Sequence, residues 1–162
     1  MKTVIKSVLY LQMTALLVTA ALAGPAAKNE APFRGAIETV TTGCTLEGEF
    51  LRCVQTGTGN ATHLGRFTLD WEIEINLTAL TATGVYVFTA ANGDELFTTF
   101  VASGFPTDDP NVLHIVEVHT ITGGTGRFAE ATGSFVHDAL ANEAPPTTSG
   151  SLEGTIVLPE GK

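Results

Sequence analysis

Apolar and polar residues alternate strictly from Thr62 to Leu77, the clearest pattern in the chain. A period of two over this length predicts a long strand with one buried face. We expect Gly65 to bend this strand. The odd-numbered positions should point into a core, and they are His63, Gly65, Phe67, Leu69, Trp71, Ile73, Ile75 and Leu77.

Two further strand-like runs, Val85–Ala91 and Asp94–Val101, flank an Asn-Gly pair. Asn-Gly favours a two-residue hairpin turn, so the pattern predicts an antiparallel pair of strands. The resulting register sets residues of the two strands opposite each other: Phe88 with Phe97, and Tyr86 with Thr99.

Cys44 and Cys53 bracket a third hairpin, with Gly48-Glu49 at its turn. Counting outward from the turn places the two cysteines opposite each other at a non-hydrogen-bonded pair, where facing residues come closest. In an oxidising compartment this spacing predicts a disulfide. A metal pair is disfavoured, because two thiols need further ligands and none is nearby in the sequence.

Strand signals recur through the rest of the chain, and no helix of useful length is predicted outside the N-terminal segment. We count about eight or nine strands in one domain and expect an all-β fold. Closure into an antiparallel barrel removes the sheet edges, although periodicity alone also fits a sandwich. The remaining strands are expected at Phe33–Thr42, Val112–Thr122, Arg127–Asp138 and Ser151–Leu158, with loops at Ser103–Asn111 and Asn142–Gly150.

The N-terminal residues have the pattern of a secretory signal peptide. Lys2 and Lys6 precede the apolar run Val8–Ala20, and Ala21-Leu22-Ala23 forms a small-x-small cleavage site. We expect residues 1–23 to be removed, residues 24–32 to be a flexible leader, and residues 33–162 to form the barrel. The apolar run is shorter than the ~20 residues that span a bilayer, so an exported, periplasmic or extracellular protein without a membrane anchor is predicted.

Charge narrows the range of partners. Without Lys2 and Lys6, six basic residues face 17 acidic ones, and the formal net charge moves from −9 to −11. Such a surface repels nucleic acid and anionic membranes. We therefore expect neither as a partner.

The segment Ile121–Phe135 contains four glycines and superficially resembles a dinucleotide-binding loop. A loop of that kind needs a following helix whose N-terminus binds the pyrophosphate. No amphipathic helix follows here, and only 24 residues separate Asp138 from the end of the sequence. The segment is therefore interpreted as a glycine-rich turn between neighbouring strands, and no cofactor is expected.

This segment also resembles the strand–turn–strand signature of the dirigent and allene oxide cyclase proteins. The resemblance implies an eight-stranded antiparallel barrel. It further implies a protein that orients a small molecule, as dirigent proteins do, or an isomerase of the allene oxide cyclase type. The catalytic residues of that family lie outside the motif, so none is assigned here. The matching positions are Gly123, Gly124, Thr125, Gly126, Arg127, Phe128, Ala131 and Gly133.

Candidate chemistry rests on histidines and aromatic residues. No two of the four histidines have metal-ligand spacing on a helix, and we expect no metal. Glu117 and His119 lie two apart on one predicted strand, so a carboxylate can orient an imidazole there. The residues that we expect to line a ligand cavity, if the barrel is open, are His63, Trp71, Tyr86, Phe88, Phe97 and His114.

The sequence is compatible with three functions. The barrel binds or orients a small apolar or aromatic molecule, or it is an isomerase or cyclase, or it is a structural module with a filled interior. A cavity favours the first two, and a buried ionisable pair in that cavity favours the enzyme. The sequence leaves open whether the chain forms a homo-oligomer.

Overall fold

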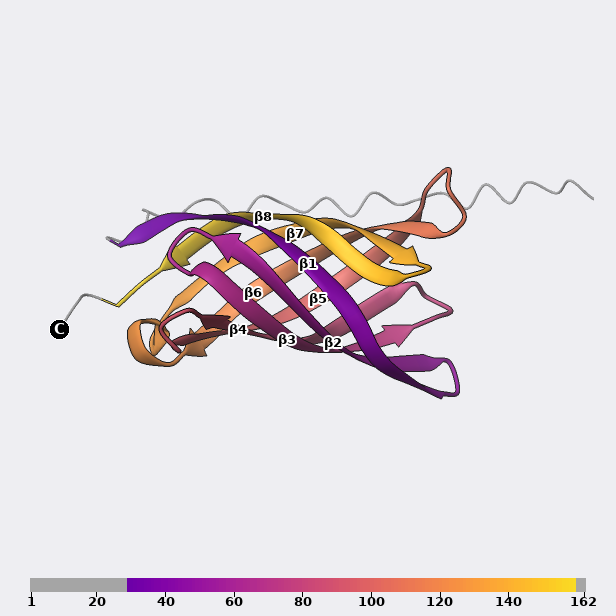
Figure 1. Ribbon diagram of the computed structural model, residues 1–162, viewed down its shortest axis with the longest axis horizontal. Helices are drawn as coiled ribbons and strands as arrows, with labels where there is room; N and C mark the ends of the chain where they lie inside the picture. Colours follow the sequence, from indigo (N-terminus) through magenta and orange to yellow (C-terminus); the bar gives the residue numbers. More distant parts are fainter. Residues whose placement is uncertain (1–28, 160–162) are drawn as a thin grey trace, which may run out of the picture.

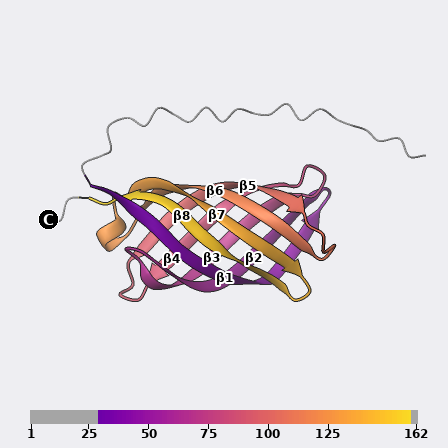
Figure 2. The same cartoon turned by 90° about the horizontal axis from the view of Figure 1, so that it is seen from above.

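Eight antiparallel strands close into a barrel in the computed structural model, which describes residues 29–159 (Figures 1 and 2). Each strand pairs with its neighbours in sequence, and β1 pairs with β8, so the sheet has no free edge. The predicted barrel is confirmed. The elements are β1 (Glu30–Glu47), β2 (Phe50–Ala61), β3 (Gly65–Asn76), β4 (Thr81–Ala90), β5 (Glu95–Pro106), β6 (Val112–Gly124), the 3-10 turn η1 (Gly126–Phe128), β7 (Thr132–Glu143) and β8 (Pro146–Val157).

The alternation seen in the sequence decides which residues fill the barrel. Phe67, Leu69 and Trp71 of β3 are buried, as predicted from their odd positions. Eight strands enclose an interior just wide enough for side chains to fill. The expectation for His63 is wrong, because the chain turns before β3 begins at Gly65. His63 lies in that turn with φ of 68° and is exposed.

The two ends of the barrel differ. The turns after β2, β4 and β6 lie at one end, together with η1, which Figure 1 shows as an orange curl on the side of the C-terminus. Phe128 of η1 is fully buried there, and Leu64 and Leu96 are also buried. We call this the plugged end. The other end, the mouth, carries the turns at residues 47–50, 76–81, 106–112 and 143–146.

The glycine-rich segment forms part of the plug. Thr125 exchanges two hydrogen bonds with Glu95, each of 2.8 Å. Gly126 has φ of 52°, and a Cβ there would displace the carboxylate of Asp94, so this position favours glycine. The predicted turn between strands is confirmed. The predicted strand start at Arg127 is wrong, because residues 126–128 form η1 and β7 begins at Thr132.

The hairpin of β4 and β5 has a different register from the one predicted. Its loop has three residues, Ala91 to Gly93, closed by bonds from the Gly93 N–H to the Ala90 carbonyl and from the Ala90 N–H to the Asp94 carbonyl, both 2.9 Å. Gly93 takes the left-handed position that three-residue loops use. The one-residue difference turns every side chain of β5 to the other face. The observed pairs are Phe88 with Leu96, Val87 with Phe97, and Tyr86 with Thr98.

The cysteine hairpin has the predicted register. Cys44 pairs with Cys53 at a Cα–Cα distance of 4.1 Å, and the two form a disulfide. Gly48 supplies the positive φ that the turn needs. The disulfide therefore joins β1 and β2 close to the mouth.

Several strands are longer than predicted. β1 begins at Glu30, inside the predicted leader, and β5 and β8 extend into both predicted loops, to Pro106 and from Pro146. Pairing with a long neighbour on each side keeps these turn-rich sequences extended. The predicted signal peptide lies outside the described residues. Among residues 29–159, no helix is long and apolar enough to cross a membrane.

Candidate functional site

A cavity of about 140 Å³ opens inside the barrel near the mouth. Its wall is largely apolar, with a few polar side chains among the apolar ones. Cavities of roughly 150 Å³ hold a molecule the size of benzene, so this one suits a single ring or one end of a longer molecule. The lining residues are Gln55, Trp71, Ile73, Ile75, Leu80, Thr81, Ala82, Ala102, Ser103, Gly104, Leu113, Ile115, Glu117, Ala141 and Thr148.

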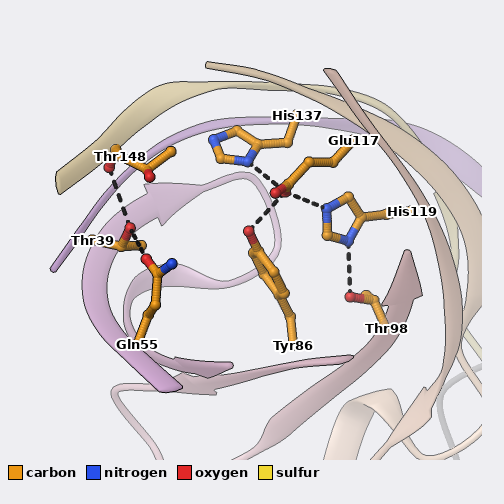
Figure 3. A network of polar contacts seen from close by, with 8 residues as sticks. All are labelled: Thr39, Gln55, Tyr86, Thr98, Glu117, His119, His137 and Thr148. Atoms are coloured by element: carbon orange, nitrogen blue, oxygen red, sulfur yellow. Dashed lines mark hydrogen bonds and ion pairs between the residues drawn. The ribbon is translucent and has the colours of Figure 1, made fainter. Parts of the chain in front are cut away.

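Glu117 is the centre of a buried hydrogen-bond network on the cavity wall (Figure 3). Three side chains reach its Oε2 atom from different sides. The Tyr86 hydroxyl lies at 2.7 Å, His119 Nε2 at 3.0 Å and His137 Nδ1 at 2.8 Å. Cross-strand pairing brings His137 and Glu117 together, because His137 on β7 lies directly opposite Glu117 on β6. His119 lies two residues further along β6, on the same face.

The network holds Glu117 as a carboxylate. Burial by itself raises the pKa of this group, but the hydrogen bonds and charges of His119 and His137 outweigh burial and lower the pKa to about 2. Burial lowers the pKa of His119, although Glu117 opposes that shift. Burial, followed by the charge of Glu117, raises the pKa of Tyr86 well above its ordinary value.

An ionised Glu117 determines the direction of the hydrogen bonds around it. A carboxylate only accepts, so the Tyr86 hydroxyl, His119 Nε2 and His137 Nδ1 each donate to Oε2. At pH values above its lowered pKa, His119 is neutral and has an acceptor at Nδ1, which takes the hydroxyl hydrogen of Thr98 at 3.0 Å. The network therefore keeps a buried negative charge surrounded by hydrogen-bond donors.

A second, smaller polar cluster lies apart from Glu117 in Figure 3. The Thr39 hydroxyl lies 3.1 Å from Gln55 Oε1 and 3.4 Å from the Thr148 carbonyl. Gln55 and Thr148 also line the cavity. In addition, two buried nitrogens have no partner in the described structure, Nε1 of Trp71 and Nε2 of His137.

The structure separates the predicted ligand residues into two groups. Trp71 lies on the cavity wall, Tyr86 belongs to the network, and Phe88 is buried in the core. The other three lie elsewhere. Phe97 is on the outer face because of the changed hairpin register, and His63 is in the exposed turn at the plugged end. His114 also lies on the outer wall, where its Nε2 is 3.0 Å from Asp138 Oδ1.

The sequence indicated Glu117 and His119 as a possible pair, but the other polar residues of the two clusters apart from Tyr86 were missed. They are Thr39, Gln55, Thr98, His137 and Thr148. His137 carried a usable signal, since it alternates with Phe135 on the buried face of β7. Thr98 was missed because the predicted register placed it outside. Thr148 was missed because it fell in a predicted loop.

Glu117, His119 and His137 are also a group of described residues able to hold a metal ion, since one ligand atom from each lies within 4.8 Å of the others. Comparison of the chain with protein-family models, with curated proteins and with solved structures finds no match in any of the three. Because one fold hosts many functions, this site and not the barrel itself indicates the function.

Proposed function

We propose that this protein binds and orients a small, largely apolar molecule in the mouth cavity. The observation that carries the proposal is the cavity itself, which has an apolar wall and a few polar groups, the composition of a small-molecule site. The small side chains of Ala102 and Ala141 leave room for the ring of a ligand, and Trp71 gives that ring an aromatic contact. Gln55 and Glu117 give it hydrogen-bond partners.

Orientation is favoured over proton transfer by the state of Glu117. An acid–base catalyst works best with a pKa near the operating pH. The carboxyl group of Glu117, with a pKa of about 2, is a weak base, and Tyr86, with its raised pKa, is a weak acid. An isomerase or cyclase is the second candidate, because Glu117 is ionised, buried and on the cavity wall.

Export is part of the proposal. Disulfides persist in oxidising compartments, and the Cys44–Cys53 bond supports a periplasmic or extracellular location. The mass of the exported chain should correspond to a protein that begins at Gly24. Recovery of only the full-length chain would contradict export with cleavage.

Trp71 makes the ligand test direct, because it is the sole tryptophan and lies on the cavity wall. Titration with one-ring aromatic probes such as phenol and nitrobenzene should quench its fluorescence to saturation. Ala141→Leu should weaken binding at least tenfold, because the added carbons fill the cavity. Val136→Leu on the outer face of the same strand should leave affinity unchanged. Absence of saturable quenching, or equal weakening in both variants, would contradict the proposal.

A further inference from the structure

The geometry points to a divalent transition-metal site formed by Glu117, His119 and His137 at the wall of the mouth cavity. The three side chains come from adjacent strands and are almost completely buried, with exposures of 1%, 0% and 0%. Two imidazoles and one carboxylate are a common ligand set for zinc and for non-haem iron. The helical spacings that indicate metal sites in a sequence do not reveal this one, because the barrel brings the ligands together across strands.

The separations of the ligand atoms suit a shared ion. Glu117 Oε2 lies 3.0 Å from His119 Nε2 and 2.8 Å from His137 Nδ1. Two ligands bound at ~2.1 Å and at right angles to each other are about 3 Å apart. The three atoms lie within 4.8 Å of one another, and the two imidazole nitrogens must be no more than ~4.2 Å apart to share an ion with bonds of ~2.1 Å. The Tyr86 hydroxyl, 2.7 Å from the same oxygen, is a neighbouring fourth group.

Charge also favours a cation at this position. Within residues 29–159, the ion-pair partners of Glu117 are the two imidazoles, and neither Lys nor Arg pairs with it. A carboxylate held in an apolar interior is stabilised when a cation compensates its charge. A bound ion would replace the imidazole hydrogens that now point at Oε2.

The surroundings hold His119 in the orientation that ligation needs. Its Nδ1 lies 3.0 Å from the Thr98 hydroxyl. With an ion on Nε2, the proton would sit on Nδ1 and be donated to that hydroxyl oxygen, the second contact typical of metal-binding histidines. Its ring is stacked on Phe135 with centroids 4.4 Å apart and an angle of 9° between the planes. The ring is therefore fixed before any ion arrives.

An ion at this site would have a side open to small molecules. Glu117 lines the mouth cavity, so a coordination position next to it faces the cavity. Zinc sites that act on substrates keep one such open position. The metal site goes beyond the proposed binding function and does not depend on it, because its three ligands are present whether or not an organic molecule enters the cavity.

Metal titration of the exported chain tests the inference. The protein is stripped with a chelator, dialysed, and titrated with Zn²⁺, Mn²⁺ and Co²⁺ by calorimetry. We expect one ion per chain for at least one of the three, and visible Co²⁺ bands if cobalt is bound. Glu117→Gln and His137→Gln should weaken binding at least 100-fold. His114→Gln should have no effect, because that histidine pairs with Asp138 on the outer wall.

Nuclear magnetic resonance of the wild-type imidazole nitrogens gives a readout that needs no variant to fold. Zn²⁺ should shift His119 Nε2 and His137 Nδ1. No binding of any of the three ions, or shifts confined to His63 and His114, would overturn the metal site. Ala141→Leu separates the two proposals, since it should weaken probe binding at least tenfold and retain zinc binding. Loss of zinc binding in Ala141→Leu, with the fold intact, would also count against the assigned ligands.

Discussion

The plugged half and the mouth half of the barrel are built from the same eight strands, yet their interiors differ. Towards the plugged end, aromatic rings such as Phe33, Phe88 and Phe135 fill the interior, with Phe33 and Phe135 centroids 4.9 Å apart. Towards the mouth, side chains such as those of Ala102 and Ala141 are shorter, and the space that they do not fill is the cavity. The packed half therefore buries large apolar rings, whereas the mouth half holds polar groups and a cavity, and we expect the packed half to contribute more to stability.

A single strand shows the change of environment along the barrel. On β6, Ile121 is part of the packed core, His119 and Glu117 are in the polar network, and Ile115 and Leu113 line the cavity. All five point inward, because they are two residues apart. The polar network thus marks the boundary between the packed half and the open half.

The largest expected loss of stability comes from a substitution at the plugged end. Phe128→Ala removes a fully buried ring and should lower the free energy of unfolding by about 3–5 kcal/mol. The matched variant Phe105→Ala removes a half-exposed ring from the mouth half and should cost less than about 1 kcal/mol. Urea unfolding followed by Trp71 fluorescence measures both. Equal losses in the two variants would remove the distinction between the halves.

Low pH should lower the free energy of unfolding, because it protonates the polar network at the boundary between the halves. The pKa of Glu117 is about 2 in the folded chain and near 4.5 in the unfolded chain, so the unfolded state takes up the proton first. The resulting stabilisation, roughly 3 kcal/mol, is present above pH 4.5 and is lost as the pH falls towards 2. His119, whose folded pKa is lowered from 6.5, adds a loss that begins below pH 6.5.

Unfolding measured from pH 7 to pH 2.5, with chelator present, checks this expectation. Glu117→Gln should flatten the acid limb of the profile. Glu153→Gln, an exposed residue that forms an ion pair with Arg34, should leave the limb unchanged. An acid limb with the same slope in Glu117→Gln as in the wild type would show that other groups control acid stability.

A smaller effect is expected at the rim of the mouth. Replacement of both Cys44 and Cys53 with alanine should lower the free energy of unfolding by about 2–3 kcal/mol, because the disulfide closes a short loop and limits the unfolded chain. Peptide mapping without reductant identifies the bond, and urea unfolding gives its contribution. Two free thiols in the exported protein, or an unchanged midpoint in the variant, would contradict this prediction.

The sequence predicted most of the strands that form the barrel wall. Alternation on β3 identified its buried face, and counting from Gly48 gave the Cys44–Cys53 pair. Both predictions depend on local rules, the period of a strand and the geometry of a short turn. The β4–β5 hairpin shows the limit of such rules, because Asn-Gly fits two loop types whose registers differ by one residue.

The interior could not be predicted in the same way. The cavity depends on which side chains face one another across the barrel, and no short sequence window contains that information. His137 reaches Glu117 through the register of β6 with β7, and Thr148 lines the cavity because β8 continues through a turn-rich sequence. The pair of Glu117 and His119 could be predicted from the sequence because both residues lie on one strand.

The pairing of β1 with β8 has a consequence for engineering the chain. Glu30 lies opposite Val157, so the described ends of the barrel are adjacent and lie at the plugged end, away from the cavity. Because closure makes this seam equivalent to any other strand pair, a short linker between the two ends should allow circular permutation with new termini in the loop at residues 107–111. A tag or surface tether joined at residue 29 or at residue 159 should leave the mouth facing solution, whereas the permuted chain would place a fused domain beside the mouth.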